Sequence, residues 1–208
     1  MNRGDKRGMT TIHLIRHAPV ADDHLVYCYG NTDVPVAPVC ERTSAALARN
    51  LPRPASWYVT PLSRTVATAQ AIFAAGYDPA DLVVEPDLIE QNFGALQGIA
   101  HDLLHQHLKG PAHPFWVIDP DEVPDQGESS TQMVSRVGPA IERLAARHAG
   151  EHVVVVAHGG SIRAAVAHAM GIPMRAAMHF SIRNQSVTRL LRNGSGWHVL
   201  AVNEQFPL

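Results

Sequence analysis

Arginine, histidine and glycine residues follow three apolar segments of the sequence. They are Arg16 and His17 after residues 10–15, Arg64 after residues 57–60, and His158, Gly159 and Gly160 after residues 152–157. The guanidinium group offers a planar fork of donors that matches phosphate oxygens. Glycine lets backbone N–H groups approach an anion at the start of a helix. Together these residue types predict a phosphate-binding site, provided that the three segments end at the same place.

Each of these residues also has an ordinary interpretation when it is taken alone. The pair Arg16-His17 could be a polar strand end at the surface, Arg64 an exposed helix residue, and His158 a helix cap. Three neighbouring segments with the same chemistry are harder to explain in this way, so we expect an anion site.

The elements that must bring these residues together alternate between strand and helix. We expect strands at 10–15, 57–60, 82–85, 152–157, 186–192 and 197–203, and helices at 40–51, 61–75, 129–148 and 161–170. The continuous apolar run "HVVVVA" is typical of a strand buried on both faces, as in a parallel sheet. The order predicts an α/β protein, a three-layer α/β/α sandwich with a mostly parallel central sheet. Ligands bind at the carboxyl ends of the strands in such sheets.

The second expected helix shows how Arg64 could be presented. Thr60 is expected to cap this helix, with Pro61 in its first turn. Arg64 and Thr68 lie off the apolar stripe of the helix, and Arg64 lies near the positive end of its dipole. We therefore expect Thr68 to contact the substrate beside Arg64.

Composition restricts the class of protein. The chain has 208 residues, of which 46% are hydrophobic and 17% charged, with a formal net charge of −2. These values predict one folded domain over residues 10–208 and argue against a general partner in nucleic acid or membrane. Residues 1–9 are expected to form a disordered N-terminal tail. The interval 91–135 is rich in Gly, Pro, His and Asp, and is predicted to be a lid or insertion over the site.

Cysteine and histidine usage gives two further expectations. Cys28 and Cys40 are too few for a disulfide scaffold and are expected to be free thiols, which suits the cytoplasm, as does the lack of a visible signal or membrane segment. His101, His105 and His107 cluster with partly helical spacing, which raises the alternative of a metal site. No third ligand suggests itself, so a solvated helix face is preferred and neither a metal nor another cofactor is expected.

Four segments in order resemble the motifs of the histidine phosphatase superfamily, also called the phosphoglycerate mutase-like family. They are "LIRHAPV", "TPLSRTVATAQ", "LIEQNFGALQG" and "VVVAHGGSIR". The segment "DQGESSTQMVSRV" is similar to one common in the phosphatase branches, and the resemblance covers about residues 10–204. It implies a phosphoglycerate mutase-like fold.

The resemblance also implies catalytic roles. His17 would attack phosphorus and become a phosphohistidine. Arg16, Arg64 and His158 would hold the phosphoryl oxygens and offset charge in the transition state, with no metal required. Glu90 would donate a proton to the leaving alkoxide and then help to activate water.

The sequence departs from the family pattern just after the predicted nucleophile. Ala18 replaces a glycine of the family motif, and Pro19 follows where Glu or Gln is usual. A family asparagine six residues after the nucleophile falls on Asp23 if no gap intervenes, and a carboxylate there would repel phosphate. Asn31 is an alternative substrate-binding amide.

The function expected from these features is hydrolysis of a small phosphate ester by a phosphomonoesterase. A phosphoglycerate mutase-type transferase is the first alternative, but residues 91–135 contain no arginine and only Lys109 to hold a second anionic group. A non-catalytic phospho-ligand binder is the second. A serine esterase is excluded because no G-x-S-x-G element occurs. Trp116, with Phe115 and His113, predicts an aromatic patch over the pocket that would suit a leaving group with a ring.

Overall fold

Six strands form one central sheet in the computed structural model, which describes residues 8–116 and 118–207. In sheet order they are β3 (Leu82–Val84), β2 (Ser56–Val59), β4 (His152–Ala157), β1 (Thr10–Arg16), β5 (Val187–Asn193) and β6 (Gly196–Glu204). The expected residues 1–9 tail lies mostly outside the described residues. The first strand begins at Thr10, as the apolar pattern predicts.

The sheet is mixed, with its parallel pairs at the side that carries the predicted site. β1 pairs with β4, β4 with β2, and β2 with β3 in parallel, whereas β5 pairs antiparallel with both β1 and β6. The β5–β6 hairpin turns at Gly194-Ser195, one residue later than the predicted Asn193-Gly194, because Asn193 still pairs with Gly196. The predicted α/β fold with a mostly parallel central sheet is confirmed.

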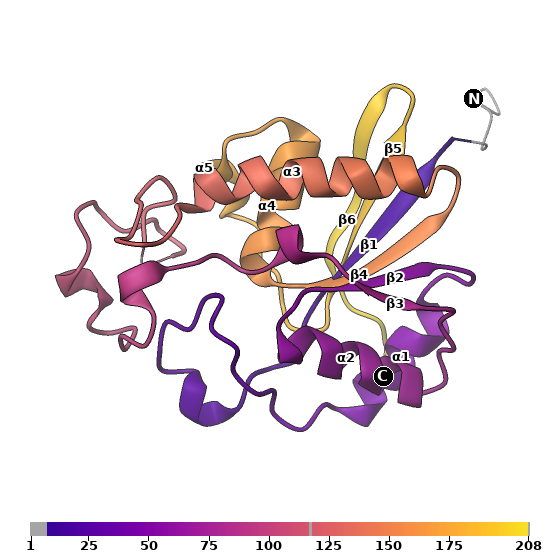
Figure 1. Cartoon of the computed structure of the whole chain (residues 1–208), viewed down its shortest axis with the longest axis horizontal. Coiled ribbons are helices and arrows are strands. Elements are labelled where there is room, and N and C mark those ends of the chain that lie inside the picture. The colour runs from indigo at the N-terminus through magenta and orange to yellow at the C-terminus, as the bar shows by residue number, and fades with distance from the viewer. Residues whose placement is uncertain (1–7, 117, 208) are drawn as a thin grey trace.

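Helices cover both faces of the sheet (Figure 1). One face carries α1 (Glu41–Asn50) and α2 (Ser63–Ala74), and the other carries α3 (Ser130–Arg147), α4 (Gly159–Met170) and α5 (Met174–Ala177). No helix among the described residues is long and apolar enough to cross a membrane.

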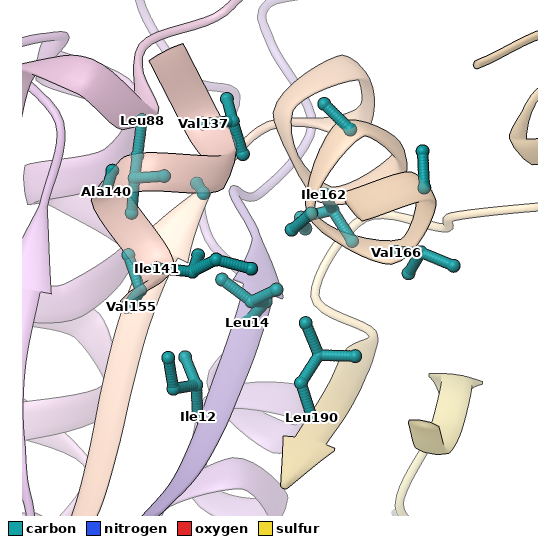
Figure 2. Packing of buried hydrophobic residues seen from close by; sticks show 14 of the residues in the cluster. Ile12, Leu14, Leu88, Val137, Ala140, Ile141, Val155, Ile162, Val166 and Leu190 are labelled. Atoms are coloured by element: carbon teal, nitrogen blue, oxygen red, sulfur yellow. The ribbon is translucent and has the colours of Figure 1, made fainter. Parts of the chain in front are cut away.

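The apolar run of β4 is divided between the two faces. Val153 and Val155 pack with α3 and α4, whereas Val154 and Val156 pack with α1 and α2. Figure 2 shows the first of these clusters, in which Ile141 of α3 packs close to Leu14 of β1. Since alternate strand residues point to opposite faces, a strand buried on both sides must be apolar throughout.

The starts of two helices differ from the sequence expectation, and one short helix was not predicted. α2 begins at Ser63 with Leu62 as its N-cap, so Thr60 does not cap it and Pro61 precedes it. α4 begins at Gly159, two residues earlier than expected, because the glycine pair adopts helical geometry directly after the strand. The short helix α5 is absent from the expected elements, because its four residues carry too little periodicity.

The segment 91–135 is held by backbone pairing to the loop that follows β1. It contains short 3₁₀ helices at Gly94–Leu96 and Leu104–Gln106, and much of it lies to the left of the sheet in Figure 1. Its backbone exchanges hydrogen bonds with residues 26–28. The Cys28 N–H donates to the Ile99 oxygen at 2.9 Å, and the Gly98 N–H donates to the Cys28 oxygen at 2.8 Å. The segment 91–135 and residues 26–28, which are distant in sequence, are therefore paired through their backbones.

The helix–sheet packing predicts which apolar truncations are costly. Ile141→Ala should lower the free energy of unfolding by about 3 kcal/mol, because it removes a fully buried side chain and leaves a cavity. Leu200→Ala, at a residue that is 47% exposed, should cost less than about 1 kcal/mol. Urea unfolding of the two variants measures both values. Equal losses would contradict this description of the core.

Candidate active site

The carboxyl ends of three parallel strands bring the predicted residues together. Arg16 pairs in register with Ala157, so the residues that follow β1 and β4 are neighbours. The rings of His17 and His158 lie 5.2 Å apart between centroids. Val59, at the end of β2, pairs with Val156, which places Thr60 beside His158. The site predicted from three strand ends is therefore assembled at one edge of the sheet.

The His17 ring is fixed by the backbone of its neighbour. Nδ1 of His17 donates to the carbonyl oxygen of Ala18 at 2.6 Å. Because a carbonyl oxygen can only accept, the proton lies on Nδ1, and Nε2 carries the lone pair. The Ala18 N–H donates to Oγ1 of Thr68 at 2.8 Å, and Nδ2 of Asn184 donates to the His17 oxygen at 2.8 Å. Both peptide groups around the ring are thus anchored.

Both histidines are held in the neutral form. Burial, followed by the charge of Arg64, lowers the pKa of His17 from 6.5 to about 3. Burial also lowers the pKa of His158 well below its ordinary value, with the neighbouring His17 and Arg64 acting in the same direction. A neutral imidazole with a free lone pair can act as a nucleophile.

Arg64 is completely buried and bound to main-chain oxygens. Its two Nη atoms donate to the carbonyl oxygens of Thr32 at 2.7 Å and Gly30 at 2.6 Å. Desolvation by burial is the largest effect on this guanidinium and lowers its pKa, while Glu90 counteracts it. The arginine is therefore a fixed positive charge beside His17.

Three buried nitrogen atoms at this edge have no hydrogen-bond partner within the described part of the chain. They are Nε of Arg16, Nε of Arg64 and Nδ1 of His158. Buried polar atoms are rarely left unpaired, because each costs about 1–3 kcal/mol of desolvation. On the other side of its ring, Nε2 of His158 lies 2.9 Å from the hydroxyl of Thr60. Three unpaired nitrogens on neighbouring buried side chains are suited to an anion such as a phosphoryl group.

Glu90 is held against the start of α4. Its Oε2 accepts from the Gly160 N–H at 3.0 Å, and its Oε1 accepts from the Gln91 N–H at 3.0 Å. A Cβ atom at position 160 would lie 2.2 Å from Oε1 of Glu90, so glycine is required for this close approach. The Gly160 amide, expected to face the anion, thus binds the carboxylate instead.

Arg136 of α3 holds the loop that carries Glu90. It donates to the carbonyl oxygens of Asp87 and Ile89, each at 2.8 Å, and to that of Glu90 at 3.2 Å. Its Nη2 also forms an ion pair of 2.6 Å with Glu128. This network fixes the backbone of the loop that carries the Glu90 carboxylate.

A cavity of about 280 Å³ opens beside these residues. Its charged and glycine lining comprises Arg16, Arg163, Glu90, Gly30, Gly159 and Gly160. Its remaining lining is mostly aromatic or apolar and comprises Leu25, Tyr27, Cys28, Tyr29, Phe93, His101, Trp116, Met174 and Met178, with the polar Gln91 and Ser130. His17 and His158 are buried, each adjacent in the chain to a lining residue, Arg16 and Gly159 respectively.

The residues predicted to bind substrate divide into two groups. Gly159, Gly160 and Trp116 line the cavity. Thr68 does not, because it is fully buried and its hydroxyl donates to the Arg64 oxygen at 2.7 Å while accepting from Ala18. Asn31 is also not among the lining residues, and its backbone N–H donates to the side chain of Gln97 at 3.2 Å.

Two departures from the family motif have a structural explanation. Ala18 is buried and is not among the described non-glycine residues with a positive φ, so its backbone does not require glycine. Asp23 lies in the short 3₁₀ helix Asp22–His24, largely exposed and 3.7 Å from His24, so its carboxylate does not line the cavity.

Several residues at the site were not predicted from the sequence. Asn184 reaches His17 from the loop before β5, 167 positions away in sequence. Arg136 of α3 binds the Glu90 carbonyl oxygen and Glu128 pairs with Arg136, and only their place in "DQGESSTQMVSRV" could have indicated them. No group of three or more His, Cys, Asp or Glu side chains among residues 8–116 and 118–207 is arranged to hold a metal ion, so the histidines around residue 101 do not form one.

Comparison with known proteins identifies the family. The model of the histidine phosphatase superfamily (branch 1) matches residues 12–205. The chain belongs to this superfamily. The expected membership and the expected enzyme class, a phosphatase-family enzyme, are confirmed.

Relatives within the superfamily carry different names. A metal-independent phosphoserine phosphatase of Arabidopsis thaliana is 31% identical over 160 residues, which cover 75% of this chain and 67% of the relative. A probable phosphoglycerate mutase of Cronobacter sakazakii is 26% identical over 91% of this chain and 88% of its own length. The structure of a mycobacterial glucosyl-3-phosphoglycerate phosphatase superposes with a TM-score of 0.79 at 21% identity, covering 95% of this chain and 100% of that one. The last of these shows the shared fold alone.

The low pKa of His17 predicts a pH dependence of stability. An unfolded chain protonates this histidine near pH 6.5, whereas the folded protein resists protonation down to about pH 3, so stability falls as the pH falls below 6.5. Between pH 7 and pH 5, His17 should account for a loss of about 2 kcal/mol. Urea unfolding of the His17→Gln variant should show a correspondingly smaller loss. The exposed control His198→Gln should behave like the unaltered protein, and an unchanged slope for His17→Gln would contradict the assignment.

Proposed function

We propose that this chain is a metal-independent phosphomonoesterase in which His17 is the nucleophile and Glu90 the general acid and base. Nε2 of His17 attacks phosphorus, a P–N bond forms, and the P–O bond to the alcohol breaks. Glu90 in its protonated form gives its proton to the leaving oxygen. Water then attacks the phosphohistidine and gives a proton back to Glu90, releasing phosphate and free His17.

The observation that carries this proposal is the hydrogen bond from Nδ1 of His17 to the Ala18 oxygen. It selects the tautomer whose lone pair lies on Nε2, and the low pKa keeps that lone pair unprotonated. A histidine that only bound a phosphate ligand would serve better as a protonated cation. The geometry therefore favours catalysis over the non-catalytic binder.

Arg16, Arg64 and His158 are proposed to stabilise charge on the transferred phosphoryl group. Both arginines present buried Nε atoms that lack a partner among the described residues. The Thr60 hydroxyl can donate to Nε2 of His158, which leaves Nδ1–H of the neutral ring to donate to a phosphoryl oxygen. Preorganised donors of this kind supply most of the catalysis in phosphoryl transfer.

A phosphatase is favoured over a mutase by the charge of the cavity wall. A mutase must hold a second anionic group, yet the segment 91–135 contains no arginine and only Lys109. That lysine is 79% exposed and lies 3.8 Å from Asp125, and it does not line the cavity. The relative named a metal-independent phosphoserine phosphatase supports the same choice.

We also propose that residues 91–135 act as the lid over the site. Gln91, Phe93, His101, Trp116 and Ser130 of this segment line the cavity. The aromatic rings pack on one another, with Trp116 6.3 Å from Phe93 and 6.2 Å from His101 between centroids. A small phosphate ester is the expected partner, and a cytoplasmic location stays a prediction.

The central test of this function is hydrolysis of p-nitrophenyl phosphate in the presence of EDTA. The unaltered protein should turn over this ester, and His17→Ala should reduce kcat by at least about 10³-fold because the nucleophile is lost. His198→Ala, at an exposed histidine remote from the site, should retain full activity. Isomerisation of 3-phosphoglycerate in the presence of 2,3-bisphosphoglycerate, without phosphate release, would contradict the phosphatase assignment.

The role of Glu90 predicts a dependence on the leaving group. Glu90→Gln cannot donate a proton, so kcat for an alkyl phosphate should fall by about 10²–10⁴-fold. The fall for p-nitrophenyl phosphate should be much smaller, because nitrophenolate leaves without protonation. Steady-state kinetics with both esters measures the difference. Equal losses for the two esters would show that Glu90 is not the general acid.

A further inference from the structure

The charged side chains of the cavity wall are gathered at the start of α4. A Cβ atom at position 159 would lie 3.5 Å from Nη1 of Arg163 and 3.6 Å from Cζ of Arg16, so both guanidinium groups face the space beside Gly159. Glu90 is bound at the next position, where its Oε2 accepts from the Gly160 N–H. These charges therefore lie at the end of the cavity where the phosphoryl group is proposed to react.

The rest of the wall is mostly apolar or aromatic and comes from three separate parts of the chain. Leu25, Tyr27, Cys28 and Tyr29 follow β1, Phe93 and Trp116 belong to the segment 91–135, and Met174 and Met178 belong to α5 and its C-cap. Of the aromatic patch predicted from the sequence, Trp116 is among the lining residues, whereas Phe115 is exposed and packs on His179 with 4.8 Å between ring centroids. The apolar wall is therefore more extensive than the predicted patch.

The polar side chains that also line the cavity already have partners in the protein. Oγ of Ser130 donates to Oε1 of Gln91 at 2.8 Å, and Nε2 of Gln91 donates to the Glu128 carbonyl oxygen at 2.7 Å. Burial lowers the pKa of His101, so this ring carries no charge near pH 7. A hydroxyl or charged group placed against this wall would lose its bound water without equivalent hydrogen bonds in return.

Leu25 and Tyr27 extend the apolar wall to the mouth of the cavity. They line the cavity and yet are 50% and 43% exposed. Large apolar side chains grouped at a cavity and open to water mark a surface that a ligand covers, because covering them removes apolar area from water. Met174 and Met178 are flexible and can adapt to ligands of different shape. Both features favour an apolar ligand.

We infer that the preferred substrates carry an apolar leaving group, so that their class is the phosphate monoesters of uncharged aliphatic or aromatic alcohols. This inference rests on the proposed phosphatase function and specifies its substrate class. The phosphate lies at the charged end, and the carbon skeleton is buried against the apolar wall. Binding therefore strengthens as the apolar area of the leaving group grows.

The first test compares methyl, propyl and pentyl phosphate, whose alcohols differ in length but hardly in acidity. In the unaltered protein kcat/KM should rise about 4-fold for each methylene that the wall covers, as expected for transfer of CH₂ out of water. Propyl phosphate should also exceed glycerol 3-phosphate by at least about 10-fold, because the two hydroxyls of the latter lose water without equivalent partners. Equal kcat/KM values along the series, or a preference for glycerol 3-phosphate, would overturn the inference.

Leu25→Gln tests whether this wall is responsible for the preference. The substitution removes half-exposed apolar surface, so the ratio of kcat/KM for pentyl over methyl phosphate should fall by at least about 3-fold. Leu103→Gln, at a similarly exposed leucine that is not among the lining residues, is the matched control and should leave the ratio unchanged. The same ratio in Leu25→Gln as in the unaltered protein would contradict the assignment of the wall.

Binding of methyl-, propyl- and pentylphosphonate, which are not hydrolysed, separates this inference from the proposed function. Calorimetry should show a Kd that falls about 4-fold for each methylene that the wall covers. A Kd that does not change along the series would overturn the inference even in an active phosphatase. A Kd that falls as expected in a protein that does not hydrolyse p-nitrophenyl phosphate would support the apolar site and refute the proposed function.

Discussion

The hydrogen bond between Nδ1 of His17 and the Ala18 oxygen is the constraint on which the site depends. It requires that the chain bend back on itself directly after β1, and the fold secures this bend from two sides. Thr68 of α2 holds the Ala18 amide, and Asn184 before β5 holds the His17 carbonyl. β1, which lies between a parallel and an antiparallel neighbour, therefore continues into a loop in which the N–H and C=O groups of His17 and Ala18 are all hydrogen bonded. The ring is oriented by backbone geometry without needing a carboxylate partner.

The second constraint is that positive charge is concentrated at a site that is buried from solvent. Arg64 is fully buried, and it is stabilised by two main-chain oxygens in place of an ion pair. Burial of His17, together with the positive charge of Arg64, suppresses protonation of His17, and that charge is also available to an anion. Glu90 is the carboxylate that approaches the group, and its approach depends on the absence of a side chain at Gly160. The buried charges of Arg64 and Glu90 are electrostatically unfavourable for the folded site, and the same charges prepare it for phosphoryl transfer.

The sequence predicts the strands and the catalytic set better than it predicts the contacts of the site. The unbroken valine run of β4 and the shared chemistry after three strands are local signals, so the sheet edge and the juxtaposition of His17 with His158 could be expected. The role of Thr68 could not, because its position off the apolar stripe does not reveal that it packs beneath Ala18. The same limit applies to Thr60, expected to cap α2 and found beside His158. Asn184 and Arg136 act across long sequence separations, which periodicity and spacing do not encode.

Direct detection of a phosphorylated His17 tests the central claim most sharply. The protein is mixed with an excess of substrate, quenched within milliseconds in alkali, and digested for mass spectrometry of the peptide that contains residues 14–20. The account predicts a phosphohistidine at His17 that is stable in alkali, labile in acid, and formed and lost at rates consistent with turnover. Phosphate release at an undiminished rate with no label on His17, or with the label on another residue, would contradict it.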